Sequence, residues 1–327
     1  MRSSPQTVLV ITSLRDATAN MVIEALIVRR VQVARIDPAD IGSALTFSAH
    51  IGDDRAEWGG WLRTASRDVA LEEIGAAYYR RPSSWHSDAF DDQAQRFVVT
   101  EARYGLGGLL RSLPNCRYVN HPAADARADF KVTQLQAAAK VGLRAPKTLI
   151  TNDLNAAQEF ARKHDRVIYK SFRGAPPTSE GHVGAIWTQR ISSDDLDDSL
   201  SLTAHLFQEE IQKAADVRVT AVGQNVFASK ITAPGGALDW RCGDWGELIY
   251  EDIEVPEAIR KAIHAYLNMF GLEFGCFDFG LEGGIDDQST ESWTFIECNP
   301  NGQWGWLPNS DSIARAFAHV LLEGWWS

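Results

Sequence analysis

Short apolar runs alternate with amphipathic stretches along the first part of the chain. The apolar run from Val8 to Ser13 is followed by apolar positions at helical spacing over 19–27 and by a second apolar run over 31–37. This strand, helix, strand succession is typical of the opening of an open α/β sheet. No Gly-x-Gly-x-x-Gly sequence follows the first run, which argues against a dinucleotide site there.

A buried strand is predicted over 74–82, and it ends in Arg80 and Arg81. A long amphipathic helix follows over about 91–112. Because ligands gather at the carboxyl ends of strands in open α/β sheets, either arginine could hold a substrate carboxylate or phosphate. A salt bridge that closes the sheet edge is an equally good interpretation.

Residues 123–172 predict two helices and two strands, the second strand spanning 167–172. Lys170 lies on this apolar strand, and a buried lysine without a partner is costly, so we expect it to face an anion. The following segment, 173–184, is rich in glycine and proline. Such loops let backbone N–H groups approach phosphates, although the spacing does not match a Walker A loop.

Strands dominate the last third of the chain. Residues 216–222 and 225–231 predict a hairpin, and Asp216 and Arg218 share one strand face because they are two apart. These two side chains could bind a ribose and a phosphate. They could equally form a cross-strand ion pair.

The strongest candidate chemistry lies on the final two strands, predicted over 274–279 and 293–299 with turn formers between them. A hairpin would bring Asp278 beside Glu297 and Asn299, which share a strand face. Two carboxylates and an amide oxygen suit Mg²⁺. In isolation such a pattern is more often a solvated strand face, but apolar flanks favour coordination because buried acids are costly unless they are paired or bind something.

Composition and charge place the chain among globular proteins. Its 327 residues suffice for two or three packed units, and its 45% apolar and 23% charged fractions are ordinary for that class. No run of about 18 apolar residues could span a membrane, and the first apolar run is too brief for a signal peptide, so we expect a cytoplasmic protein. The net charge of −11 argues against a nucleic-acid partner.

The four cysteines are scattered without a Cys-x-x-Cys pair, which argues against a zinc site or a disulfide framework. Cys298 neighbours Glu297, but on a strand it points to the opposite face. We interpret Cys298 as a buried thiol rather than a nucleophile.

The order of these features resembles the ATP-grasp ligase superfamily, most strongly from Asn120 to Leu307. A lysine after Asn-His-Pro, a lysine on a strand, a glycine-bearing loop, Gln-Glu-x-Ile, Asp-x-Arg-x-Thr and a final Asp with Glu-x-Asn occur in that order. Tyr79-Arg-Arg-Pro82, Asp239-Trp-Arg241 and above all Glu297-Cys-Asn-Pro-Asn-Gly-Gln-Trp304 are similar to the microviridin-type, or graspetide, peptide maturases.

The resemblance implies a mixed α/β (α+β) ATP-grasp fold. An N-terminal open α/β pre-ATP-grasp domain would span 1–120. A central subdomain with a phosphate-covering loop would span 121–205, and a C-terminal ATP-grasp subdomain with the Mg²⁺ site would span 206–327.

The same resemblance assigns expected roles to individual residues. Lys131 and Lys170 would hold the ATP phosphates, and Asp216 the ribose hydroxyls. Asp278, Glu297 and Asn299 would bind Mg²⁺. The remaining expected site residues are Glu209, Glu210 and Ile211 at the adenine, Arg218, Lys230 and Arg241 at the γ-phosphate or an acyl phosphate, and Arg80, Arg81 and Asp239 at the substrate.

The implied activity is ATP-dependent macrocyclisation of a ribosomal precursor peptide, consisting of leader and core, through ω-ester or ω-amide links between Asp or Glu and Ser, Thr or Lys side chains. ATP would convert the carboxylate into an acyl phosphate, and phosphoryl transfer needs mainly positioning and charge neutralisation. The loop at 173–184 would be the lid that excludes water. Trp187 and the acidic segment 192–201, which lies in a predicted helix over 193–202, could bind the leader, although a solvated helix face is the commoner reason for such a run.

Two rival functions stay open. An ATP-grasp ligase of free amino acids or of a protein C-terminus would use the same nucleotide site. A catalytically inactive peptide-binding protein would keep the fold, but the complete set of lysines and acids argues against it. Homodimer formation is expected only by analogy.

Overall fold

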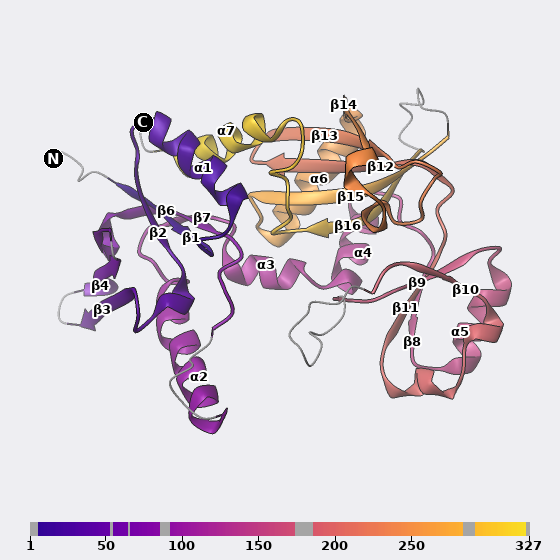
Figure 1. The fold of residues 1–327 in the computed structure, drawn as a ribbon, viewed down its shortest axis with the longest axis horizontal. Helices are drawn as coiled ribbons and strands as arrows, with labels where there is room; N and C mark the ends of the chain where they lie inside the picture. The colour runs from indigo at the N-terminus through magenta and orange to yellow at the C-terminus, as the bar shows by residue number, and fades with distance from the viewer. Residues whose placement is uncertain are drawn as a thin grey trace.

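The computed structural model describes residues 6–52, 55–64, 66–85, 92–173, 186–283 and 292–324. In these ranges the strands form four sheets. Figure 1 shows them in three groups, with the N-terminal sheets, the central sheet and the C-terminal sheet lying in different parts of the molecule.

The N-terminal unit is built on a parallel sheet, as the alternating pattern predicts. Its strand order is β2 (Gln32–Ile36), β1 (Thr7–Ile11), β6 (Ile74–Tyr79) and β7 (Arg117–Val119). Every residue of β1 is buried, as expected for a parallel strand that is covered on both faces. The helices of this unit are α1 (Ala17–Val28) and α2 (Asp92–Leu109).

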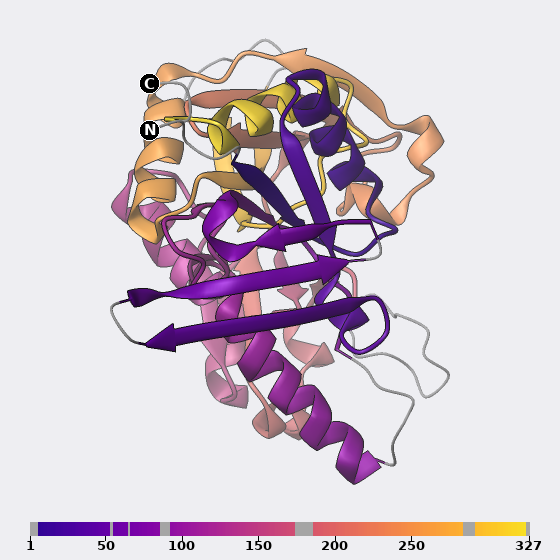
Figure 2. The same cartoon turned by 90° about the vertical axis from the view of Figure 1, so that its left-hand side faces the viewer.

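The N-terminal unit also contains a second, antiparallel sheet. It consists of β3 (Leu45–Gly52), β4 (Arg55–Thr64) and β5 (Asp68–Ala70). Figure 2 shows the long strands of this sheet in front and α2 projecting away below them.

The central unit has a four-stranded antiparallel sheet and one covering helix, α5 (Leu154–Lys163). Its strand order is β10 (Gln189–Ile191), β9 (Val167–Lys170), β11 (His205–Glu209) and β8 (Thr148–Thr151). The boundary predicted between 205 and 206 falls inside this sheet, because β11 pairs with both β8 and β9.

The α-helix predicted over 193–202 is wrong. The structure has two short 3₁₀ turns instead, at Ser193–Asp195 and Asp198–Leu202. The side chain of Asp195 accepts from the Ser192 N–H at 2.7 Å, and that of Asp197 accepts from the Ser199 N–H at 2.9 Å. Acids that bind nearby backbone N–H groups compete with a continuous helix, so these residues act as caps. The pKa of Asp195 is lowered by the Ser192 N–H, and the pKa of Asp197 is lowered by the Ser199 hydroxyl and then by the Ser199 N–H.

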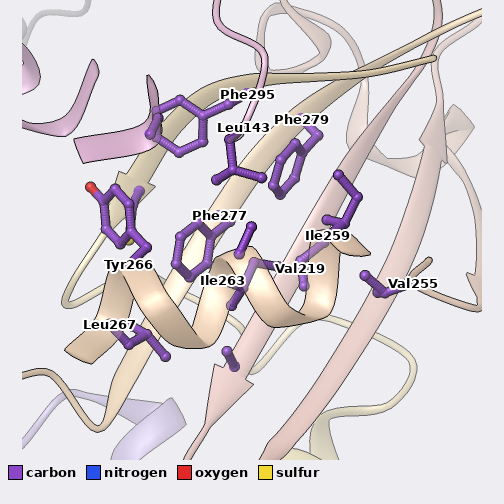
Figure 3. Packing of buried hydrophobic residues seen from close by; sticks show 14 of the residues in the cluster. Leu143, Val219, Val255, Ile259, Ile263, Tyr266, Leu267, Phe277, Phe279 and Phe295 are labelled. Carbon is purple, nitrogen blue, oxygen red and sulfur yellow. The ribbon is translucent and has the colours of Figure 1, made fainter. Parts of the chain in front are cut away.

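The C-terminal unit is a five-stranded antiparallel sheet. Its strand order is β14 (Ile249–Ile253), β13 (Asn225–Thr232), β12 (Lys213–Val222), β15 (Phe274–Glu282) and β16 (Trp293–Asn299). Helix α6 (Glu257–Phe270) covers one face, and Figure 3 shows Phe277 and Phe279 packed against it. Because side chains alternate along a strand, Asp278 between them points to the opposite face.

Helices α3 (Pro122–Ala128) and α4 (Lys131–Lys140) connect the units and pack on the C-terminal sheet through Ala128, Ala137 and Ala138. The last helix, α7 (Ser310–Leu321), lies beside α1 (Figure 1). A single core joins β1, β6 and α1 to α7, Phe274 and Trp304. The N-terminal and C-terminal units therefore share a hydrophobic core.

None of the helices in the described ranges has the length and apolar character that crossing a membrane requires.

Candidate active site

A cavity of about 500 Å³ lies between the central sheet and the C-terminal sheet. Ile168 and Lys170 of β9 line one side. Helix α4 contributes Lys131 and Gln134. The C-terminal sheet contributes five polar side chains, Lys213, Asp216, Asp278, Glu297 and Asn299.

The three side chains predicted to bind a metal converge in this cavity. In the hairpin of β15 and β16, Asp278 is paired with Glu297, and Cys276 with Asn299. The Asn299 amide nitrogen donates to Asp278 Oδ2 at 3.4 Å and to Glu297 Oε1 at 3.3 Å. Cys298 points away from them and is buried, as predicted, and burial raises the pKa of its thiol.

The donor set suits a hard cation that takes further ligands from a phosphate. No cluster of three or more His, Cys, Asp or Glu side chains in the described ranges could hold a metal by itself. Two carboxylates and an amide oxygen leave coordination positions for water and phosphate oxygens, which is the usual protein environment of Mg²⁺. With a cation bound, the Asn299 amide would present its oxygen, and the amide orientation is free to follow the hydrogen bonds around it.

Asp278 is tied to a buried arginine. Arg218 donates from Nε to Asp278 Oδ1 at 2.7 Å and from Nη2 to Oδ2 at 3.2 Å. The same guanidinium donates from Nη1 to the Gln303 carbonyl oxygen at 3.1 Å. Burial raises the pKa of Asp278 although Arg218 opposes this. Arg218 does not line the cavity, so it holds the Asp278 carboxylate in place without facing the cavity itself.

The two lysines predicted at the phosphates reach the cavity from different elements. Lys131, at the start of α4, forms an ion pair with Glu297. Burial alone would raise the pKa of Glu297, but Lys131, Arg241 and Lys170 lower it. Lys170 comes from β9 on the opposite side, and burial lowers its pKa to about 8, with the nearby cations adding to the effect. A lysine held in that state is strongly stabilised by an anion.

Asp216 lines the cavity beside a lysine that the sequence analysis did not single out. Lys213 Nζ lies 2.6 Å from Asp216 Oδ1 and 2.7 Å from Oδ2. Burial raises the pKa of Asp216 to about 6, although Lys213 opposes the shift. Asp216 and Arg218 do not pair with each other, but Arg218 forms a cross-strand ion pair with Asp278 of β15.

Asp239 and Arg241 form a pair at the edge of the cavity, in the loop between β13 and β14. Arg241 donates from Nε and Nη2 to the two oxygens of Asp239, both at 2.8 Å. The Arg241 guanidinium lies 5.9 Å from the ring of Trp187, and Thr188 donates to Asp239 Oδ2 at 3.5 Å. This loop therefore contacts the segment that leads into β10.

The two neighbouring arginines at the end of β6 lie in different environments. Arg80 is completely buried, with Nε 2.9 Å from Asp16 Oδ2 and Nη1 donating to the Gly302 carbonyl oxygen at 3.0 Å. Its expected role as a substrate ligand is not supported, because it is the buried salt bridge of the alternative interpretation. Arg81 lines the cavity and donates from Nε to the Asn301 carbonyl oxygen at 3.1 Å.

Comparison with known proteins links this geometry to an enzyme class. Residues 7–126 match the family model of the MvdD pre-ATP grasp domain. A RiPP-associated ATP-grasp ligase from Chryseobacterium gregarium, solved with ADP and a leader and core peptide, is 26% identical with a TM-score of 0.87, over 97% of both chains. The chain is an ATP-grasp ligase.

Other solved structures agree with this assignment. Macrocyclase MdnC from Microcystis aeruginosa MRC, bound to the precursor peptide MdnA, is 25% identical with a TM-score of 0.82, over 97% of this chain and 99% of that chain. The ATP-grasp ligase PsnB, solved with a precursor variant, Mg and ADP, is 19% identical with a TM-score of 0.71, over 97% and 98%. At that identity the likeness shows the fold alone. A search of curated proteins gives no match.

Besides Arg80 and Arg218, two more predicted site residues of the ligase lie outside the cavity lining. Lys230 is paired in register with Val217, whose side chain packs in the core beneath α6, and its amine binds Glu251 of β14. Lys230 therefore lies on the face away from Asp278. Glu209 lies at the end of β11 and its carboxylate pairs with Lys147 at 3.3 Å.

The other two residues predicted at the adenine are closer to the site. Glu210 and Ile211 line the cavity. The Glu210 carboxylate, however, accepts from Nε and Nη2 of Arg190 at 2.7 and 2.8 Å. Glu210 is therefore bound to an arginine of β10 in the central sheet. The lid predicted over 173–184 lies outside the described residues except for Arg173, which pairs with Asp129 at 2.8 Å.

Sequence reasoning missed several cavity residues of the ligase. Lys213 could have been found from its spacing to Asp216 at the start of β12. Ile168 and Ile296 were hidden in apolar strand runs, and the bulge that exposes Ile296 between Phe295 and Glu297 has no sequence signal. Gln134 was missed because the helix that carries it was predicted from its apolar positions, which do not include Gln134.

Proposed function

We propose that this ATP-grasp ligase closes ω-ester or ω-amide links between Asp or Glu and Ser, Thr or Lys side chains of a ribosomal precursor peptide. The observation that carries the proposal is the meeting of Asp278, Glu297 and Asn299 with Lys131 and Lys170 in one cavity between two sheets. The likeness to peptide-modifying ligases over nearly the whole chain supports the peptide as substrate.

The cavity offers a consistent place for ATP. Ile168 on one side and Ile211 and Ile296 on the other form apolar surfaces suited to an adenine ring. Asp216 is a carboxylate that can accept from ribose hydroxyls. Lys131 and Lys170 then lie where the phosphates would follow, near the three oxygen ligands.

Magnesium would be held by Asp278, Glu297 and Asn299, and when bound it supplies neutralisation of phosphate charge. The protein's own residues do the rest of the positioning. Lys131 is paired with Glu297 in this structure, and both groups can exchange that contact for a phosphate and a cation. Such an exchange costs little electrostatic energy, because each charge keeps an opposite partner throughout.

The chemistry we propose has two steps. A peptide carboxylate attacks the γ-phosphorus of ATP, the bond to the β-phosphate oxygen breaks, and ADP leaves. The hydroxyl or amine of a second side chain then attacks the acyl carbon, loses a proton, and expels inorganic phosphate. Arg81 and Arg241 also line the cavity, and their guanidinium groups suit a carboxylate or an acyl phosphate.

The proposal is tested with purified ligase, ATP, Mg²⁺ and a short peptide encoded beside its gene that contains Thr, Ser or Lys and Asp or Glu. We expect one ADP formed and one water lost from the peptide mass for each ring. Addition of an amino acid to the peptide mass would favour a ligase of free amino acids. Tight peptide binding without ADP formation from any candidate would favour an inactive binding protein.

A further inference from the structure

Strand β16, which carries Glu297 and Asn299, is the edge strand of its sheet. The strand order places β15 on one side of it and no strand on the other within the described residues. Edge strands have one row of backbone N–H and C=O groups without a strand partner. Cys298, the residue between the two candidate metal ligands, has both of its backbone groups on this open side, because they meet a side chain of α4 there.

That side chain is the buried amide of Gln134. The Cys298 N–H donates to Gln134 Oε1 at 3.1 Å, and Gln134 Nε2 donates to the Cys298 carbonyl oxygen at 2.7 Å. The same nitrogen donates to the Ala128 carbonyl oxygen at the end of α3, at 2.8 Å. Gln134 is only 4% exposed. Its amide thus makes the pair of hydrogen bonds that a neighbouring strand would make, and both of its N–H donors and its carbonyl oxygen bind partners inside the protein.

A second buried amide holds the other side of Asn299. Asn120 Nδ2 donates to the Pro300 carbonyl oxygen and to the Phe274 carbonyl oxygen, both at 2.8 Å. Its Oδ1 accepts from the backbone N–H of Phe274 at 2.9 Å. The backbone on each side of Asn299 is therefore fixed by an amide from outside the hairpin.

Helix α4 delivers two contacts to the same short stretch of β16. Lys131 and Gln134 are three apart and so lie on one helix face. Lys131 meets the side chain of Glu297, and Gln134 meets the backbone of the next residue. The position of α4 is therefore coupled to the direction in which Glu297 and Asn299 point.

We infer that Gln134 is a positioning residue for the metal site, whose amide completes the open edge of β16 and aims the oxygens of Glu297 and Asn299 into the cavity. The inference rests on the proposed Mg²⁺ role of those two residues. Groups that orient the ligands of a metal commonly change its affinity by about ten- to a hundredfold when they are removed. Mg²⁺ is sensitive to such changes because it requires nearly octahedral geometry.

The test compares Gln134→Met, which keeps the length and loses both hydrogen-bonding functions, with Gln134→Glu, which can still accept from the Cys298 N–H but cannot donate when ionised. Gln136→Glu is the matched control, because Gln136 is exposed on the same helix. Calorimetry would measure ADP binding to each full-length variant over a range of Mg²⁺ concentrations. Thermal unfolding without metal would show which variants fold.

We expect Gln134→Met to need about ten- to a hundredfold more Mg²⁺ for half-maximal ADP binding, with Gln134→Glu also raised and Gln136→Glu unchanged. ADP binding without Mg²⁺ should stay close to that of the wild type in all three. A purely structural role predicts a lower melting temperature with an unchanged Mg²⁺ requirement, and that result would overturn the inference. If Gln134→Met does not fold, the same criterion applied to Gln134→Glu decides. Absence of any Mg²⁺ effect in the wild type would instead contradict the proposed function.

Discussion

The two walls of the cavity are built in different ways. The C-terminal wall, formed by β12, β15 and β16, packs on a core of more than twenty buried residues that includes residues of α3, α4 and α6. The C-terminal unit also shares a second large core with the N-terminal unit. The central wall includes β9, and the sheet of β9 and β11 packs on a smaller core of Ala157, Val167, Leu200 and Phe207. Local stability follows buried apolar contact, so we infer that the two walls open with different free energies.

Their chemistry differs in the same way. On the C-terminal wall Asp278 is held by Arg218, and Asp216 by Lys213, through short hydrogen bonds. On the central wall Lys170 has a lowered pKa because burial outweighs the attraction of Glu297. The proposed metal and ribose ligands are thus preorganised on the firmly packed wall. Lys170, which we propose binds phosphate, lies on the smaller unit, and its charged form would be stabilised most by a bound anion.

The largest expected effect comes from the C-terminal wall. Glu297→Ala should lower the rate of ADP formation by about a thousandfold, which corresponds to roughly 4 kcal/mol of lost transition-state stabilisation. Steady-state assays with the peptide substrate measure it, and peptide affinity should be retained. Glu282→Ala is the control, because Glu282 lies on the same hairpin but outside the cavity lining. Equal losses in both variants would remove Glu297 from the metal site.

Removing one buried cation from each wall sharpens the contrast in stability. Arg218→Met should lower the free energy of unfolding by about 3 to 5 kcal/mol, because it leaves the Asp278 carboxylate buried without its partner. Lys170→Met should leave stability equal or higher, since it removes a desolvated charge, while it abolishes tight ATP binding. Urea unfolding of both variants measures the difference. Similar destabilisation by the two changes would break the comparison.

Hydrogen exchange tests the walls without mutation. Backbone amides of β12 and β15 should exchange on the order of a hundredfold more slowly than those of β9 and β11, because far more apolar surface is buried beneath them. ADP with Mg²⁺ should slow exchange mainly in the central wall. Uniform protection across both sheets would show that core size does not set their local stability.

The smallest effect concerns pH. The pKa of Lys170 is lowered from 10.5 to about 8. In the free ligase the Lys170 amine therefore loses its positive charge as the pH rises through 8. ATP affinity should therefore be highest below pH 8 and fall above it by up to about tenfold per pH unit. Lys170→Arg keeps its charge over this range, so its affinity should vary much less. Equal pH profiles for wild type and variant would place the titration elsewhere.

The hairpin of β15 and β16 could be predicted from sequence because strand alternation and turn residues are local signals. Asp278, Glu297 and Asn299 had to share a face once their strands were paired. Lys230 could not be placed, because period two says which residues of β13 share a face but not which face meets the cavity. That depends on its register with Val217.

Arg80 and Arg81 show the same limit. Adjacent residues at a strand end point in different directions, and only the contacts of Arg80 with Asp16 and Gly302 reveal which of them is buried. Gln134 was missed for a related reason. Its partner Cys298 is 164 positions away in the chain, and no local pattern predicts such a contact. The helix predicted over 193–202 was wrong because Asp and Ser favour capping positions over helix interiors.

The most direct test is a crystal structure of the ligase with ADP and Mn²⁺ in place of Mg²⁺, in which anomalous scattering locates the metal. We predict one strong peak bound by oxygens of Asp278, Glu297 and Asn299, with the Lys170 amine turned to the nucleotide phosphates from the opposite sheet. Well-ordered ADP with the metal bound elsewhere, or with Lys170 directed away from the phosphates, would contradict this account.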